Sequence, residues 1–232
     1  LKPYGFLLVD SGGQYADGTT DVTRTIVLGN LKSEEKRVYT AVLKGMLELA
    51  SAEFPYGYTG LELDSFARKP IQEIGLDFNH GTGHGVGYIL NVHEGPNRIS
   101  PKILDADKCI FEPGMITSDE PGAYIEGKFG IRIENLILCK EAKPSEMGRV
   151  LCFEHLTYVP IDTEGIDMLM MTDIDKNRLN CYHKAVYEKT IGFFEELMQL
   201  LHPFMPFVTE EIYHQLKDRT DDLTVKQYPA TK

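Results

Sequence analysis

The sequence predicts an α+β fold, in which strands and helices follow one another without a strict alternation. Two observations support this prediction. Runs of β-branched and apolar residues lie beside Gly- and Pro-rich turns, as in β-hairpins. Segments with apolar residues at helical spacing lie between these runs and fill the C-terminal part. With 232 residues, the chain is long enough for one large domain, or for one domain and an appendage.

A β-hairpin is expected at the start of the chain. Residues 6–10 (FLLVD) form a short apolar strand, and residues 22–28 (VTRTIVL) are rich in β-branched residues. The pair Gly12-Gly13 is expected to turn the chain between them.

Two helices are expected to follow. Ser33 is predicted to cap the first, and its buried stripe consists of Val38, Val42, Met46 and Leu49. Thr59 and Glu62 have the spacing of a capping box and predict the start of the second. Pro70 is expected to break that helix or to start a short new one, which ends near Gly75.

The middle of the chain combines a Gly- and His-rich segment with several strands. Residues 79–96 (NHGTGHGVGYILNVHEGP) form the Gly- and His-rich segment. Strands are expected near residues 109–110, 115–118 and 130–139, and one more at residues 150–160.

The C-terminal part is expected to be helical. A long helix begins at Thr172-Asp173 and continues to about Leu201. Pro203 and Pro206 interrupt it, and a final short helix starts at Thr209 with two glutamates.

Bulk composition limits the classes of function. The net charge of −11 argues against a nucleic-acid-binding surface, because phosphate binding requires clustered Lys and Arg. No apolar run reaches the length of a membrane span. The four cysteines lack metal-binding spacing and predict reduced thiols in a cytoplasmic protein. Because Leu1 leads almost directly into a strand, we expect the natural chain to begin upstream.

Five residues suggest the chemistry: Asp10, Asp21, His84, Glu120 and Glu134. All lie in segments marked by Gly or Pro. Four carboxylates gathered in one pocket repel one another unless cations neutralise them, and two divalent ions would cancel their charge. The set therefore predicts a dinuclear metal site, with a hydrolase as the first hypothesis.

The expected positions of these residues suit a shared site. Asp10 is predicted to end one strand and Asp21 to begin the next, so that the mouth of the hairpin directs both carboxylates to one point. Glu120 precedes a Pro-Gly pair at another strand end, and Glu134 is predicted to lie within a strand beside Arg132. Each residue alone is more often a turn former or a solvated surface group. Their joint appearance favours the metal site.

Several motifs carry a family resemblance. The segments DSGGQYADGTTDVTRT, HGTGHGVG, NVHEGP, DEPGAY and GIRIEN resemble the catalytic domain of the pita-bread metallopeptidases. The segment LCFEHLTYVPIDT narrows the resemblance to aminopeptidase P, the X-Pro aminopeptidases. The resemblance covers residues 1–189 and implies a pita-bread catalytic domain over this range.

The resemblance also implies a ligand set. Asp10 would chelate one metal ion, while Asp21 and Glu134 would bridge both. His84 and Glu120 would bind the second ion. Two manganese ions are implied, with cobalt or zinc as substitutes, and an oxygen-rich set with one histidine suits manganese.

Further residues receive roles by the same resemblance. His93 would contact substrate and stabilise the tetrahedral intermediate, and His80 would lie near the substrate-binding pocket. Glu120 would shuttle a proton to the leaving proline nitrogen, with Arg132 and Tyr124 as supports around the ligands. The implied reaction is removal of the N-terminal residue from peptides with proline second, by a hydroxide that bridges the two ions.

The chain departs from this family pattern at both ends. Only nine residues precede Asp10, so one half of the pseudo-twofold fold is expected to be incomplete and to lack a further substrate-site histidine. Residues 190–232 resemble the helical anticodon-binding region of valyl-tRNA synthetase. This tail has more acidic than basic residues, so no nucleic-acid partner is expected.

Alternatives follow from these departures. The apolar residues 203–208 need a partner surface, either on their own domain or in a homodimer. The chain could also be a catalytically silent pita-bread binding module, or a fusion fragment with a synthetase tail that binds RNA. The complete ligand set favours the enzyme, whose partner is a peptide with an N-terminal X-Pro sequence; no membrane partner is expected.

Overall fold

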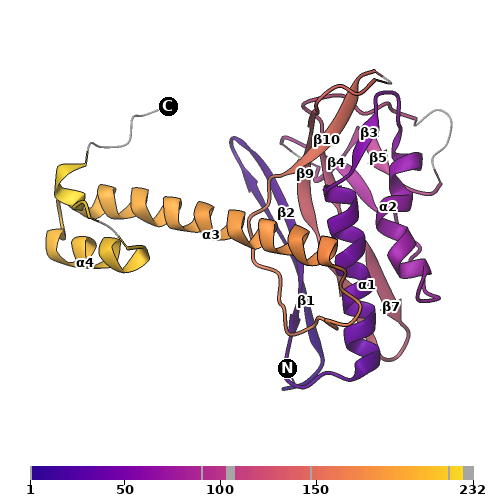
Figure 1. Ribbon diagram of the computed structural model, residues 1–232, viewed down its shortest axis with the longest axis horizontal. Coiled ribbons are helices and arrows are strands. Elements are labelled where there is room, and N and C mark those ends of the chain that lie inside the picture. Colours follow the sequence, from indigo (N-terminus) through magenta and orange to yellow (C-terminus); the bar gives the residue numbers. More distant parts are fainter. Residues whose placement is uncertain (1, 90, 103–107, 147, 219, 227–232) are drawn as a thin grey trace. The chain divides into compact units, whose positions relative to one another are not determined.

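The computed structural model describes residues 2–89, 91–102, 108–146, 148–218 and 220–226 (Figure 1). These residues form two compact units. The first comprises residues 1–157 and 161–179, and the second comprises residues 158–160 and 180–232. The predicted division at residue 189 lies within one helix and stays a prediction. The mixed α/β architecture confirms the predicted fold class.

Three sheets form the framework of the first unit. Strands β1 (Phe6–Tyr15) and β2 (Gly18–Val27) form one antiparallel pair, and β7 (Gly122–Ile125) and β8 (Phe129–Arg132) form another. The third sheet has the order β3-β10-β9-β6-β4-β5. Its strands are β3 (Glu53–Pro55), β10 (Val150–His155), β9 (Asn135–Glu141), β6 (Ile116–Asp119), β4 (Gly83–Val86) and β5 (His93–Ile99).

The initial hairpin is longer than expected. Gly12 and Gly13 lie inside β1 and pair with Asp21 and Thr20 of β2, so their prediction as the turn was wrong. The chain turns instead just before Gly18, which has a φ of +149°. This difference matters because it places Asp10 and Asp21 within paired strands and not at strand ends.

Helices α1 (Ser33–Ala50) and α2 (Gly60–Gln72) provide much of the core. The predicted stripe of α1 is confirmed as buried, with Val38, Val42, Met46 and Leu49 at most 3% exposed. Lys32 and not Ser33 is the N-cap, because the Glu35 carboxylate accepts a hydrogen bond from the Lys32 backbone N–H (2.6 Å). The capping box of Thr59 and Glu62 is confirmed at the start of α2. Pro70 lies inside α2 and does not break it.

The helices pack closely on each other and beside an aromatic cluster. A Cβ added to Gly45 of α1 would lie 2.2 Å from the Ala67 carbonyl oxygen of α2, so this approach requires glycine. Phe54, Phe111 and Phe153 form the cluster, with ring centroids 5.1–6.3 Å apart.

Two predicted strands differ in the structure. Residues 109–110 form no strand, and Ile110 makes one isolated bridge with Thr59. Residues 130–139 are divided between β8 and β9, because β8 pairs with β7 while β9 pairs with β6 and β10. Glu134 therefore lies in the link between two sheets and not within a strand. The predicted strand at residues 150–160 ends at His155.

The second unit is helical. It contains most of α3 (Asp173–Leu201), then α4 (Pro206–Leu216) and a short 3-10 helix at Leu223–Val225. Met198, Tyr213 and Leu223 form its buried core. Helix α4 begins at Pro206, three residues before the predicted start. Proline is favoured at a first helical position because its missing N–H would have no helical acceptor there.

Candidate metal centre

The hairpin places two predicted ligands on one face. Asp10 pairs with Thr23, and Asp21 pairs with Gly12. Alternate residues of one strand share a face, so Asp10 and Gly12 lie on the same face of β1. Directly opposed residues also share a face, so Asp21 lies on the face of Gly12 and is a diagonal neighbour of Asp10. Asp21 is 9% exposed, whereas the Asp10 side chain is half exposed.

Glu134 is held against this hairpin by three hydrogen bonds. Its backbone N–H donates to the Thr23 carbonyl (3.0 Å), and its Oε2 accepts from the Thr23 hydroxyl (2.6 Å). The buried guanidinium of Arg24 donates from Nη1 to the Glu134 carbonyl oxygen (2.6 Å) and from Nη2 to Asn135 Oδ1 (2.8 Å). Glu134 is thus a buried carboxylate that is fixed through both backbone and side chain.

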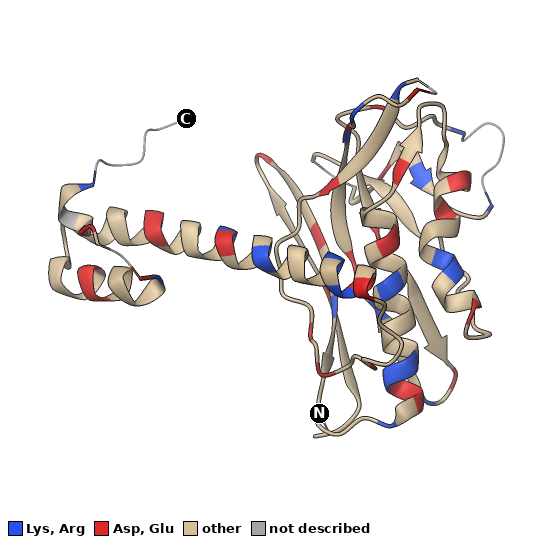
Figure 2. Cartoon of the chain, viewed as in Figure 1, with Lys and Arg blue, Asp and Glu red and all other residues tan. Residues whose placement is uncertain are grey.

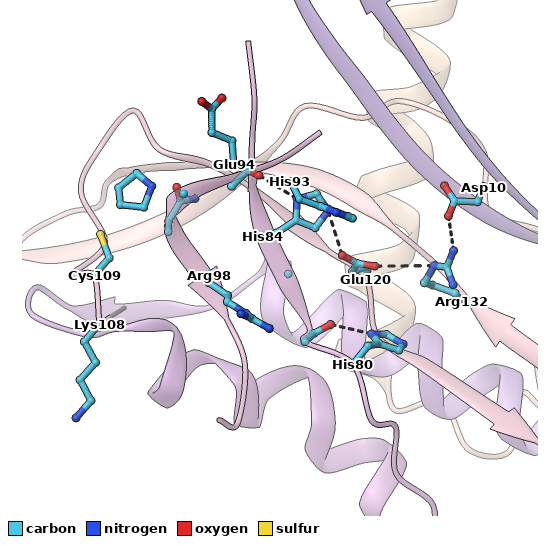
Figure 3. A pocket seen from close by; sticks show the side chains of 16 residues that line it. Asp10, His80, His84, His93, Glu94, Arg98, Lys108, Cys109, Glu120 and Arg132 are labelled. Carbon is cyan, nitrogen blue, oxygen red and sulfur yellow. Dashed lines mark hydrogen bonds and ion pairs between the residues drawn. The ribbon is translucent and has the colours of Figure 1, made fainter. Parts of the chain in front are cut away.

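His84 and Glu120 come from the large sheet, where Ser118 connects them. The Ser118 hydroxyl accepts from the His84 backbone N–H (2.9 Å) and donates to Glu120 Oε1 (3.0 Å). His84 Nδ1 lies 2.9 Å from the Gly85 carbonyl oxygen, which can only accept, so Nδ1 carries the proton. His84 Nε2 then faces Glu120 Oε1 at 3.2 Å (Figure 3). It also faces Asp21 Oδ2 at 3.5 Å.

These donors converge on one point. Ligand atoms of Asp21, His84 and Glu134 all lie within 4.8 Å of one another. Burial and the neighbouring Glu120 raise the pKa of Glu134 to about 8. Burial opposes the charged form of His84, but its hydrogen bonds to Asp21 and Glu120 outweigh this effect and raise its pKa to about 10. These raised pKa values show that, with every carboxylate ionised, the negative charge of the cluster would not be balanced by the surrounding residues.

Asp119 adds to this excess of negative charge. The side chain is fully buried, and neither carboxylate oxygen has a hydrogen-bond partner among the described residues. Burial, and then the charges of Glu120 and Glu134, raise the pKa of Asp119 well above its usual range. An oxygen-rich donor set with one oriented imidazole and surplus acid fits divalent cations.

Asp10 and Arg132 begin a polar chain across the site (Figure 3). Arg132 Nη2 donates to Asp10 Oδ2, and Arg132 Nη1 donates to the Tyr124 hydroxyl (3.0 Å). The same hydroxyl lies 2.9 Å from His80 Nε2, while His80 Nδ1 lies 2.8 Å from the Gly81 carbonyl. Since Nδ1 therefore carries the proton, Tyr124 donates to Nε2, and the two predicted supports connect Asp10 to His80.

A cavity of about 900 Å³ opens beside these groups. Its lining includes most of the predicted site residues, namely Asp10, His80, His84, His93, Glu120 and Arg132. The rings of His84 and His93 meet edge to face, with centroids 4.2 Å apart. The structure thus brings all nine predicted site residues to one region, while their catalytic and metal-binding roles remain predictions.

Three residues that hold the site were not predicted. Arg24, Ser118 and Asp119 are buried, and each contacts or adjoins a predicted ligand. In the sequence they resemble ordinary strand residues, because their partners are distant along the chain. Arg24, for example, bonds a carbonyl 110 positions away. An isolated Arg in a β-branched run was the only available signal.

We expect the metal-free protein to lose stability as pH rises from 6.5 to 8. Glu134 and His84 both bind a proton more tightly when folded, with pKa values raised from 4.5 to about 8 and from 6.5 to about 10. Their contribution is complete below the unfolded pKa and is lost as pH rises through the folded pKa. The free energy of unfolding should fall by about 2 to 4 kcal/mol over this range.

Urea unfolding with a chelator at the two pH values would measure this change. Glu134→Gln should reduce the slope with pH, because it removes one of the two titrating groups. An unfolding free energy that stays constant or rises between pH 6.5 and 8 would contradict the expectation.

Comparisons with known proteins found matches to two family models. Residues 1–141 match the model of metallopeptidase family M24, and residues 149–202 match the C-terminal region of peptidase_M24. The second match extends past residue 189 into the segment that was predicted to be a tail. None of these matches concerns a tRNA synthetase.

The relatives are longer than this chain. A probable Xaa-Pro aminopeptidase P of Ajellomyces dermatitidis is 48% identical over 198 residues, which is 84% of this chain and 32% of the relative. One of Paracoccidioides lutzii is 47% identical over 199 residues, with the same coverage of both proteins. The chain therefore spans about a third of the length of the curated relatives it matches.

Solved structures also resemble the chain. The X-prolyl aminopeptidase of Caenorhabditis elegans, described as a cytosolic enzyme with a di-nuclear active site, has a TM-score of 0.74 and 36% identity. The match covers 93% of this chain and 35% of that protein. The prolidase of Pyrococcus furiosus has a TM-score of 0.51 and 38% identity, and the match covers 57% and 38% of the two chains.

Proposed function

Because the chain belongs to metallopeptidase family M24, we propose that it forms the catalytic part of an aminopeptidase that removes the N-terminal residue before a proline. One observation carries the proposal. Ligand atoms of Asp21, His84 and Glu134 lie within 4.8 Å of one another, beside a cavity of about 900 Å³. The X-Pro specificity is supported by relatives 46–48% identical that are named as probable Xaa-Pro aminopeptidases.

The donor set would hold two divalent ions. Asp10 would bind one, His84 and Glu120 would bind the other, and the carboxylates of Asp21 and Glu134 would serve both. Manganese is the proposed metal because four carboxylates and a single imidazole form an oxygen-rich set. Two such ions supply a water of lowered pKa and polarise the scissile carbonyl. The orientation of His84 by Gly85 and of Glu134 by Thr23 prepares both ligands before any ion binds.

Residues of the cavity would perform the remaining steps. Glu120, which accepts a hydrogen bond from Ser118, would take a proton from the attacking water and return it to the proline nitrogen. His93 lies against the His84 ring and would donate to the developing oxyanion. His80 lines the same cavity and would contact the substrate beyond the scissile bond.

Tyr124→Phe tests the polar chain. The variant removes the hydroxyl that connects Arg132 to His80, but no metal ligand. We expect kcat/KM for an X-Pro peptide to fall about tenfold, with the bound metal unchanged. Tyr15→Phe, at the exposed end of the hairpin, is the matched control. Loss of metal in Tyr124→Phe, or unchanged kinetics, would contradict the proposed positioning role.

The proposal also covers location and partners. Among the residues that the structure describes, no helix combines the length and apolarity that a membrane crossing requires. We propose a cytosolic protein whose partner is a peptide.

Helices α1 and α2 each carry both acidic and basic residues (Figure 2). This mixture of charges favours a partner other than nucleic acid. A homodimer through residues 203–208 remains part of the proposal, since Phe204 and Phe207 are 83% and 89% exposed.

Metal content and peptide cleavage together test the function. The chain would be loaded with manganese, cobalt or zinc, dialysed, and analysed for metal per protein. Peptides with proline second should be cut after their first residue, whereas matched peptides with alanine second should not. Two equivalents of metal without cleavage would support the silent binding module. Absence of bound metal, or equal cleavage of the alanine peptides, would refute the proposed activity.

A further inference from the structure

An arginine that the sequence motifs did not single out lies beside the candidate metal ligand His84. Arg98 of β5 is paired directly with His84 of β4. Opposed residues of antiparallel strands project from the same face of a sheet, so Arg98 shares the face from which His84 reaches the site. Its neighbours Asn97 and Ile99 point to the other face and are 6% and 0% exposed.

The guanidinium of Arg98 is available to a ligand. Arg98 is exposed and lines the cavity, where its side chain extends towards the segment that carries His80 (Figure 3). A Cβ added to Gly81 would lie 3.7 Å from Arg98 Nε, so the side chain passes beside this glycine. Within the described part of the chain, its guanidinium makes no hydrogen bond or ion pair. Arg132, by contrast, is already bonded to Asp10 and Tyr124.

An arginine that lines this cavity without a partner among the described residues suits one kind of ligand. Guanidinium groups bind carboxylates through two parallel charge-assisted hydrogen bonds. The position also bears on where along a peptide the carboxylate lies. Opposed Cα atoms are about 5 Å apart, and an extended peptide advances about 3.3–3.6 Å per residue. Arg98 is therefore close enough to contact the first residues after a bond that is cleaved at His84 and Glu120.

We propose that Arg98 binds a carboxylate on the leaving-group side of the substrate. The carboxylate is the free C-terminus of a di- or tripeptide, or an acidic side chain of the third residue. This subsite rests on the proposed function, because that function places the scissile bond beside His84. It makes the enzyme selective for short or acidic X-Pro peptides.

Binding of non-hydrolysable peptides tests the subsite without relying on turnover. The probes are analogues of Ala-Pro-Ala in which a methylene replaces the scissile carbonyl: the free acid, its C-terminal amide, and an Ala-Pro-Asp amide. Their dissociation constants would be measured by calorimetry on the metal-loaded full chain. The wild type should bind the free acid or the Asp amide about tenfold or more tightly than the uncharged amide.

Variants of the arginine complete the test. Arg98→Gln should abolish the preference without weakening binding of the uncharged amide, and Arg98→Lys should restore part of it. Lys69→Gln removes a positive charge from α2 outside the cavity and should leave the preference intact. Tight binding of the free acid identifies a C-terminal carboxylate, and tight binding of the Asp amide identifies an acidic side chain.

Three results would overturn the proposal. They are equal affinities of the wild type for charged and uncharged probes, no binding of any probe to the wild type, and an equal loss of affinity for all probes in Arg98→Gln. The proposed function can fail separately. If the charge preference is present but X-Pro peptides are not cut, the carboxylate subsite stands and the aminopeptidase activity does not.

Discussion

Asp21→Asn and His84→Ala are each expected to abolish metal binding and peptide cleavage. Asp21→Asn preserves the shape of the side chain but removes one of the negative charges that would balance the two ions of the proposed site. His84→Ala removes the imidazole whose Nε2 faces Asp21 at 3.5 Å and Glu120 at 3.2 Å. Loss of an outer partner of a metal ligand typically costs about 10- to 100-fold, so loss of a ligand should exceed that range.

Metal per chain after dialysis, together with the rate of X-Pro cleavage, measures both effects. Asp17→Asn is the matched control, because it makes the same chemical change in the exposed turn of the same hairpin. Wild-type metal content and activity in either ligand variant would show that the site has been assigned to the wrong residues.

Arg24→Met is expected to destabilise the protein by about 3 to 5 kcal/mol, because it leaves buried acceptors without their donor. Arg24 is 7% exposed and donates to the carbonyl oxygens of Thr23 and Glu134 and to Asn135 Oδ1. The same contacts fix Glu134 against the hairpin. Metal affinity should therefore fall with stability, although Arg24 is not a ligand.

Urea unfolding and metal titration of this variant would be compared with two others. Arg24→Lys keeps the charge but cannot form the forked contacts, so it should recover only part of the stability. Arg37→Met changes an exposed arginine of α1 that donates a 3.1 Å hydrogen bond to the Ile74 carbonyl oxygen, and should have little effect. A loss below about 1 kcal/mol in Arg24→Met would contradict the structural role.

Local sequence rules predicted the elements well where the interactions are local. The stripe of α1 follows from helical periodicity, and the capping box of α2 involves Thr59 and Glu62, only three residues apart. These local rules were less successful where the pairing of two strands decides where a strand ends and a turn begins. Gly12 and Gly13 look like a turn, yet ten consecutive residue pairs of β1 and β2 extend past them. Pairing with Thr20 and Asp21 outweighs the turn preference of two glycines.

The same division holds for the site. The nine predicted residues could be proposed together because each motif carries recognisable side-chain chemistry, and the structure brings them to one region. Their actual geometry depends on how consecutive strands are distributed between different sheets. Glu134 is positioned because the chain leaves β8 for another sheet at that point, which a continuous run of strand formers does not indicate.

The sequence by itself therefore determined which residues are proposed as metal donors, the family resemblance and most of the helices. Only the tertiary structure decided that Arg24 supports Glu134, that Asp119 is a buried acid without a partner among the described residues, and that Arg98 shares a face with His84. The physical reason is that side-chain chemistry and short-range spacing are properties of neighbouring residues. Burial and cross-strand register arise only when segments far apart in the chain are paired.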